Sequence, residues 1–143
     1  MKINDFIKKY RIVKEYSKND DDTVLYSDGM KISRNPYVIC KDGFKMSVQA
    51  GQSLYSTPKD VADEYEEIEI GYPSEQEVLL EKWAEGASFD EEIEYTNTVY
   101  PYVPVEVVDW VIAKHGGIDE NAVWGSMNDT QKAESGTYTI IDR

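Results

Sequence analysis

Apolar and polar residues alternate along two stretches of the chain, and this alternation predicts strands. Residues 44–50 alternate directly after the apolar run 37–40 and a turn at Gly43, a pattern typical of a half-buried β-hairpin. Residues 65–72 alternate as well, with glutamates on one side. This second strand is expected to place Tyr72 on the same face as its two isoleucines, with the glutamates on the other face.

Two stretches have helical spacing. Residues 74–85 begin with Ser74 and, three positions later, Glu77, the pairing of a capping box. Residues 104–115 begin with Pro104, which suits the first position of a helix, and continue with a stripe of valines and isoleucine. The residues expected to face the core from the first helix are Val78, Leu79, Leu80 and Trp83.

Weaker patterns fill in the remainder of the fold. Residues 3–9 suit a short helix and residues 10–16 a strand. A turn at Asp28-Gly29 predicts a hairpin between 23–26 and 31–33. Residues 138–141 suit an edge strand.

The sum is an α+β fold with a mostly antiparallel sheet and two main helices, 74–85 and 104–115. We expect a single domain over residues 1–143, since no low-complexity linker divides the chain. Residues 60–95 form an acidic strand–helix segment within it. The tail, 120–143, is less periodic, and its expected anchors are Trp124 and residues 138–141.

Composition limits the class of protein. The chain is 41% hydrophobic with eleven tyrosines and three tryptophans, enough to build a core. Its single cysteine, Cys40, fits a reducing compartment. The amino terminus lacks the apolar run of a secretory signal, and no stretch approaches the length of a membrane span. These features predict a cytoplasmic protein that does not associate with membranes.

The net charge is concentrated in one segment. Between Asp60 and Tyr95 there are fourteen acidic residues and one base, Lys82, and this balance of −13 equals the formal charge of the whole chain. Such a field opposes folding through self-repulsion and disfavours direct contact with nucleic acid. It favours a partner that presents positive charge.

The residues expected to contact that partner are carboxylates on ordered elements of the acidic segment, with one aromatic residue among them. They are Glu66, Glu67, Glu69, Tyr72, Glu77, Glu81, Glu85, Glu91, Glu92 and Glu94. Carboxylates at fixed spacing can imitate a row of phosphates and fill a basic groove.

Catalytic and metal chemistry have little support. Cys40 lies in a predicted strand and is interpreted as a buried apolar residue, and His115, the only histidine, as a helix-ending residue. Residues 19–22 lack the glycine and glutamate of a calcium loop. We expect no catalytic residues, no metal and no cofactor, and therefore a protein that is not an enzyme.

Two motifs, residues 39–50 (ICKDGFKMSVQA) and residues 99–119 (VYPYVPV through KHGGID), resemble a group of small proteins of tailed bacteriophages and prophages, mostly of unassigned function. The resemblance covers roughly residues 30–120. The family has a second cysteine where this chain has Ser56, so no paired thiols are implied. It implies a phage origin. Because small acidic phage proteins often inhibit host defence, it favours an inhibitor of anti-CRISPR or anti-restriction type, acting as a DNA mimic on a host nuclease or defence complex.

Two alternatives remain open at this point. The chain can bind a small ligand such as a nucleotide signal, with the 37–55 region and Tyr100 and Tyr102 as aromatic walls, since residues 1–59 carry a mild positive balance. It can also be a phage accessory protein whose acidity serves only its solubility.

Overall fold

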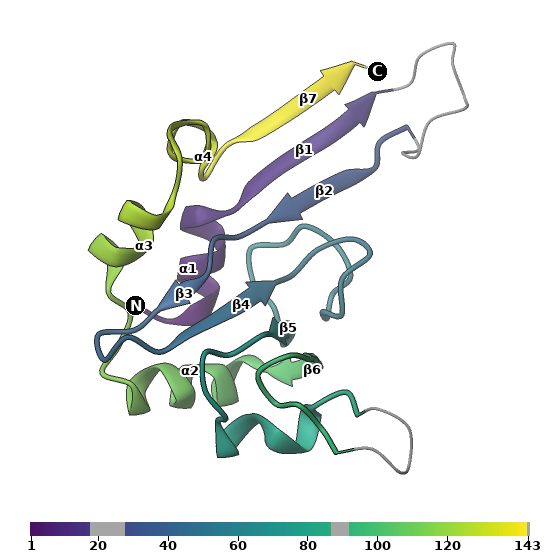
Figure 1. The fold of residues 1–143 in the computed structure, drawn as a ribbon. Coiled ribbons are helices and arrows are strands. Elements are labelled where there is room, and N and C mark those ends of the chain that lie inside the picture. Colours follow the sequence, from purple (N-terminus) through teal and green to yellow (C-terminus); the bar gives the residue numbers. More distant parts are fainter. Residues whose placement is uncertain (18–27, 87–91, 143) are drawn as a thin grey trace.

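The computed structural model describes residues 1–17, 28–86 and 92–142. They form a mixed α+β fold with mainly antiparallel strands, which confirms the predicted class, but the prediction of two main helices is wrong (Figure 1). The described residues contain four α-helices, one 3₁₀ helix and seven strands. In chain order the elements are α1 (Ile3–Tyr10), β1 (Ile12–Ser17), β2 (Lys31–Arg34), β3 (Val38–Ile39), β4 (Lys45–Gln49), β5 (Glu67–Gly71), η1 (Val78–Trp83), β6 (Val99–Pro104), α2 (Val105–Lys114), α3 (Glu120–Ser126), α4 (Asp129–Glu134) and β7 (Tyr138–Asp142).

A four-stranded antiparallel sheet has the order β3-β4-β5-β6. The predicted 37–50 hairpin is confirmed as β3 and β4, and Gly43 adopts a φ of +93° in its turn, a conformation that glycine reaches without strain. Met46 and Val48 are fully buried, whereas the alternate residues of β4 face outward. The alternation of apolar and polar residues along β4 therefore corresponds to one buried and one outward face.

The predicted strand 65–72 is confirmed as β5, but its last residue departs from the alternation. Ile68 and Ile70 are fully buried, and Ile70 pairs with Val48. Tyr72 has a φ of +49° and is 47% exposed. This left-handed conformation turns its side chain off the isoleucine face, so the expectation that Tyr72 joins that face is wrong.

A second sheet has the order β2-β1-β7 and lies beyond the β3–β4 hairpin (Figure 1). β1 pairs antiparallel with β2 and parallel with β7, with Val13 opposite both Ser33 and Tyr138. The predicted edge strand at 138–141 is confirmed. The predicted hairpin partner 23–26 lies outside the described residues, and residues 31–33 pair with β1.

Two helices supply much of the hydrophobic core. The predicted second helix, 104–115, is confirmed as α2, with Pro104 as its N-cap residue. α1 buries Ile3, Phe6, Ile7 and Tyr10 in the same cluster as the valines of α2. The Ile3 N–H donates to Asp109 Oδ1 at 2.8 Å, which joins the amino terminus of α1 to α2.

The predicted helix 74–85 is largely wrong. The element is a 3₁₀ helix that begins at Val78, and Glu77 is its N-cap residue, with a side chain that accepts from the Leu79 N–H. Ser74 does not cap it, because its Oγ accepts from the Lys45 N–H of the neighbouring hairpin. In a 3₁₀ helix, side chains three residues apart lie on one side. Leu80 is accordingly buried and Trp83 half-buried, whereas Val78 is 65% and Leu79 37% exposed.

Two short helices in the tail are absent from the sequence expectations. Asp119 caps α3 by accepting from the Ala122 N–H, and Asn128 and Gln131 form a capping box on α4. Trp124, one of the two expected anchors, is 46% exposed. Val123 and Met127, which are four residues apart and therefore share one side of the chain, are buried instead. No helix among the described residues has the length and apolar character needed to cross a membrane.

Candidate functional site

The predicted partner-contacting carboxylates do not form one face. Glu67 and Glu69 lie on the outer side of β5, as expected, but the preceding loop binds both. Thr57 Oγ1 donates to Glu67 Oε1 at 2.7 Å, and the Tyr55 N–H donates to Glu69 Oε1 at 3.3 Å. Both side chains are half-buried. These two carboxylates therefore help to hold a loop.

Glu66 and Tyr72 lie at opposite ends of β5. The carbonyl of Glu66 accepts from the Val105 N–H at the start of α2, whereas the Tyr72 N–H donates to the carbonyl of Thr98 beside the other end of the sheet. Both side chains are exposed. At about 3.3 Å per residue along a strand, Glu66 and Tyr72 are about 20 Å apart, so they do not share one small site.

Glu77 is not a surface carboxylate, so its assignment as a partner contact is wrong. It is 2% exposed. Its Oε1 lies 2.8 Å from His115 Nε2, and its Oε2 accepts from Lys114 Nζ and the Leu79 N–H. Burial raises the pKa of Glu77, but these hydrogen bonds outweigh it and leave the pKa below its ordinary value.

His115 occupies the centre of this buried cluster. Its Nδ1 lies 2.6 Å from Asp42 Oδ2, and its ring stacks on Phe44 with 4.0 Å between centroids. Burial lowers the pKa of His115, but the two carboxylates raise it above its ordinary value overall. Both ring nitrogens have a carboxylate partner, so the imidazole joins α2, the hairpin and the segment before η1. This supports the structural interpretation of His115 made from the sequence.

Cys40 is buried and its thiol is free. Burial raises the pKa of this thiol to about 11, which keeps it protonated and poorly nucleophilic near neutral pH. The interpretation of Cys40 as a small apolar core residue is supported. Within residues 1–17, 28–86 and 92–142, no group of three or more histidine, cysteine or acidic side chains is arranged to hold a metal ion.

Several predicted carboxylates do gather beside η1. Glu85, Glu92 and Glu94 line a hollow of about 720 Å³ together with Gly86 and Ile93. Glu81 lies on the adjoining 3₁₀ helix, where it accepts from Gln76 Nε2. No basic side chain in the described part of the chain forms an ion pair with any of these four glutamates. Glu91 lies outside the described residues.

The other notable features of η1 are its one base and its exposed apolar side chains. Lys82, the one base of the acidic segment, lies over the Trp83 ring at 4.6 Å and forms no ion pair with a described residue. In the three-residue repeat of η1, Val78 shares a side with Glu81. We call Val78, Leu79, Glu81, Glu85, Glu92 and Glu94 the η1 surface. It combines exposed apolar side chains with carboxylates that form no ion pair among residues 1–17, 28–86 and 92–142.

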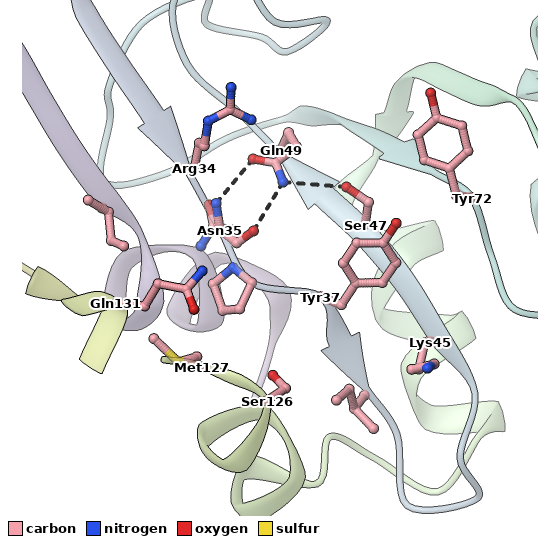
Figure 2. Close-up of a pocket in the computed structure, with 13 residues that line it drawn as sticks. Arg34, Asn35, Tyr37, Lys45, Ser47, Gln49, Tyr72, Ser126, Met127 and Gln131 are labelled. Atoms are coloured by element: carbon pink, nitrogen blue, oxygen red, sulfur yellow. Dashed lines mark hydrogen bonds between the residues drawn. The ribbon is translucent and has the colours of Figure 1, made fainter. Parts of the chain in front are cut away.

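A separate groove of about 610 Å³ opens where the two sheets meet (Figure 2). Its floor includes Lys45, Ser47 and Gln49, the outward residues of β4, and Figure 2 shows Tyr72 on one side of it and Gln131 on the other. The thirteen lining residues include two cations and no acidic residue. They are Ile12, Arg34, Asn35, Pro36, Tyr37, Ile39, Lys45, Ser47, Gln49, Tyr72, Ser126, Met127 and Gln131.

The aromatic walls expected for a ligand site are only partly found in this groove. Tyr37 lines it and is 40% exposed. Tyr100 is fully buried and donates to the carbonyl of Tyr95, and Tyr102 packs against Tyr55 with 5.8 Å between centroids. Tyr72, expected among the acidic contacts, lies at the groove instead. No local pattern in the sequence indicates that residues of α3 and α4 complete this site.

Comparison with protein-family models, with curated proteins and with solved structures finds no match.

Proposed function

We propose that this chain is a non-catalytic binding protein that docks its η1 surface on a basic protein surface. The observation that supports this is the combination of exposed Val78 and Leu79 with four glutamates that form no ion pair in the described part of the chain. Exposed apolar residues rimmed by polar ones are a feature of protein–protein contact sites. Protein interfaces typically have apolar residues at the centre and a polar rim.

Glutamates that form no ion pair within the described residues attract a basic surface over long range. In this role, Glu81, Glu85, Glu92 and Glu94 accelerate encounter and orient the partner, and burial of Val78 and Leu79 slows dissociation. The resemblance to tailed-phage proteins favours a host nuclease or defence complex as the partner, since such proteins hold nucleic acid in basic grooves.

Strict imitation of a DNA strand has less support than docking. It requires a long row of free carboxylates, whereas Glu77 is buried and Glu67 and Glu69 are bound to the 51–58 loop. The proposal therefore rests on the η1 surface. Glu66 is removed from it, at the far end of β5.

The test is affinity capture with two matched charge variants. E85K/E92K/E94K alters the η1 surface, and E64K/E66K/E106K makes the same change in net charge on exposed residues near the start of α2. The chain is immobilised and exposed to a bacterial host lysate at about 0.1 M and about 1 M salt, because the Debye length falls from about 10 Å to about 3 Å over this range.

We expect wild type and E64K/E66K/E106K to retain the same basic protein at low salt and release it at high salt, and E85K/E92K/E94K to retain none. Equal loss of capture in both variants would show that only bulk charge matters. Equal retention in both would show that the η1 surface is not the contact.

A further inference from the structure

The groove between the sheets is a preorganised polar site. The side-chain amide of Gln49 forms two hydrogen bonds with the backbone of Asn35. The Asn35 N–H donates to Gln49 Oε1, and Gln49 Nε2 donates to the Asn35 carbonyl, both at 3.1 Å. Gln49 Nε2 also lies 3.4 Å from Ser47 Oγ (Figure 2). Asn35 is 8% exposed, and its Nδ2 donates to the Ile7 carbonyl. The groove floor is thus fixed before any ligand arrives.

Two unneutralised cations lie along this floor. Neither Arg34 nor Lys45 forms an ion pair within the described residues, although the chain contains 28 acidic residues. The overall negative field repels anions from most of the molecule. A groove lined by two cations and no acid is a place where an anion can be held.

The two cations are separated along the groove. Lys45 and Gln49 are four residues apart on β4, which places them about 13 Å apart. Arg34 adjoins Asn35, whose backbone pairs with Gln49. Lys45 therefore lies near one end of the floor and Arg34 near the other, which suits a ligand with two anionic groups better than one compact anion.

The groove also presents aromatic surface. Tyr37 and Tyr72 are 40% and 47% exposed and line it. Tyr72 has a left-handed backbone, with a φ of +49°, which is costly for an aromatic residue. This backbone conformation directs the ring away from the core and to the groove. Stacking on exposed tyrosines is a common way to hold a nucleobase.

We propose that this groove binds a small nucleotide with two phosphate groups, linear or cyclic, with phosphates at Arg34 and Lys45 and a base against Tyr37 or Tyr72. The volume of about 610 Å³ lies in the usual range for small-ligand sites. A neutral ligand would leave both cations without a partner, and inorganic phosphate would not use the rings. The proposal is independent of the η1 surface.

The experiment is isothermal titration of the full chain with five probes: the linear dinucleotide pApA, cyclic di-AMP, AMP, adenosine and pyrophosphate. We expect pApA or cyclic di-AMP to bind at least about tenfold more tightly than the other three, since each charged hydrogen bond contributes a factor of about ten or more. Binding of AMP or pyrophosphate as tight as that of both dinucleotides would overturn the proposal, as would no binding of either dinucleotide.

Variants locate the site. R34Q and K45Q should each weaken dinucleotide binding by about tenfold or more, and Y37L by about fivefold or more. K8Q removes one exposed charge from α1 and should change affinity less than about twofold. K45Q retains the main-chain bonds of Lys45 to Ser74, so its fold is expected to persist. Equal effects of K8Q and K45Q would overturn the assignment, and unfolding temperatures without ligand identify any misfolded variant.

Discussion

Glu77 and His115, thirty-eight positions apart in the chain, meet in the interior with 2.8 Å between Oε1 and Nε2. Asp42 binds the other ring nitrogen of His115, and Lys114 binds the other oxygen of Glu77. One cluster therefore joins the β3–β4 hairpin, the residue before η1 and the end of α2. It fixes the start of η1 and so the position of the η1 surface.

Removing the Glu77 charge should destabilise the fold. E77Q replaces an anion that faces Lys114 and His115, and we expect it to lower the free energy of unfolding by about 2 to 3 kcal/mol in urea titrations. E85Q is the matched control, since Glu85 is exposed and forms no ion pair with another described residue, and should stay within about 0.5 kcal/mol of wild type. Equal effects of the two variants would contradict the cluster's role.

The stability of the cluster should depend on pH in a defined direction. The pKa of His115 is raised. The stability that His115 contributes is therefore complete below about pH 6.5 and is lost as the pH rises through the raised pKa. The pKa values of Asp42 and Glu77 are lowered. The stability that these two carboxylates contribute is therefore complete above about pH 4.5 and is lost as the pH falls through the lowered pKa values.

We therefore expect the stability difference between wild type and H115Q to be largest between about pH 4.5 and 6.5. The measurement is urea unfolding of both proteins from pH 4 to 9. A difference that grows steadily above pH 7 would mean that His115 is neutral in the folded protein.

Because Val78 and Leu79 of η1 are exposed, we expect that polar residues can replace them with little loss of stability. V78S/L79S should change the free energy of unfolding by less than about 1 kcal/mol, because both side chains already face solvent. L80A should cost about 2 to 5 kcal/mol, since Leu80 is fully buried. A large cost for V78S/L79S would instead support the α-helix with a buried face expected from the sequence.

The left-handed conformation of Tyr72 gives a test of backbone strain. Y72G and Y72A both remove the ring, so they differ only in the backbone. Glycine usually destabilises a protein relative to alanine, but at a φ of +49° the order should reverse, with Y72G more stable than Y72A by about 1 kcal/mol. Thermal unfolding of the pair measures this order. Greater stability of Y72A would show that the residue is unstrained.

Local patterns were sufficient to predict much of the fold. The alternation in residues 44–50 and 65–72 and the stripe after Pro104 correspond to β4, β5 and α2, because each element buries one face against one core. The prediction of an α-helix over residues 74–85 is wrong because it relies on a capping box between Ser74 and Glu77, which are three positions apart. Its actual partners, Lys114 and His115, lie far along the chain. α3 and α4 were missed because helices of seven and six residues show too few turns for periodicity.

The candidate sites were harder to predict than the fold. Counting charges identified the acidic segment, but only the structure separates the buried Glu77 and the loop-bound Glu67 and Glu69 from the unpaired Glu85 and Glu92. The groove combines residues 34–49 with Tyr72 and residues 126–131. Such a combination depends on tertiary packing and has no signature in local spacing.

The salt dependence of binding tests the docking proposal most directly. For a partner captured by the wild-type chain, the dissociation constant is measured across a salt series for wild type, E85K/E92K/E94K and E64K/E66K/E106K. We expect a steep weakening with salt for wild type and E64K/E66K/E106K, and a shallow dependence with weaker binding at low salt for E85K/E92K/E94K. The same steep slope in all three proteins would contradict docking through the η1 surface.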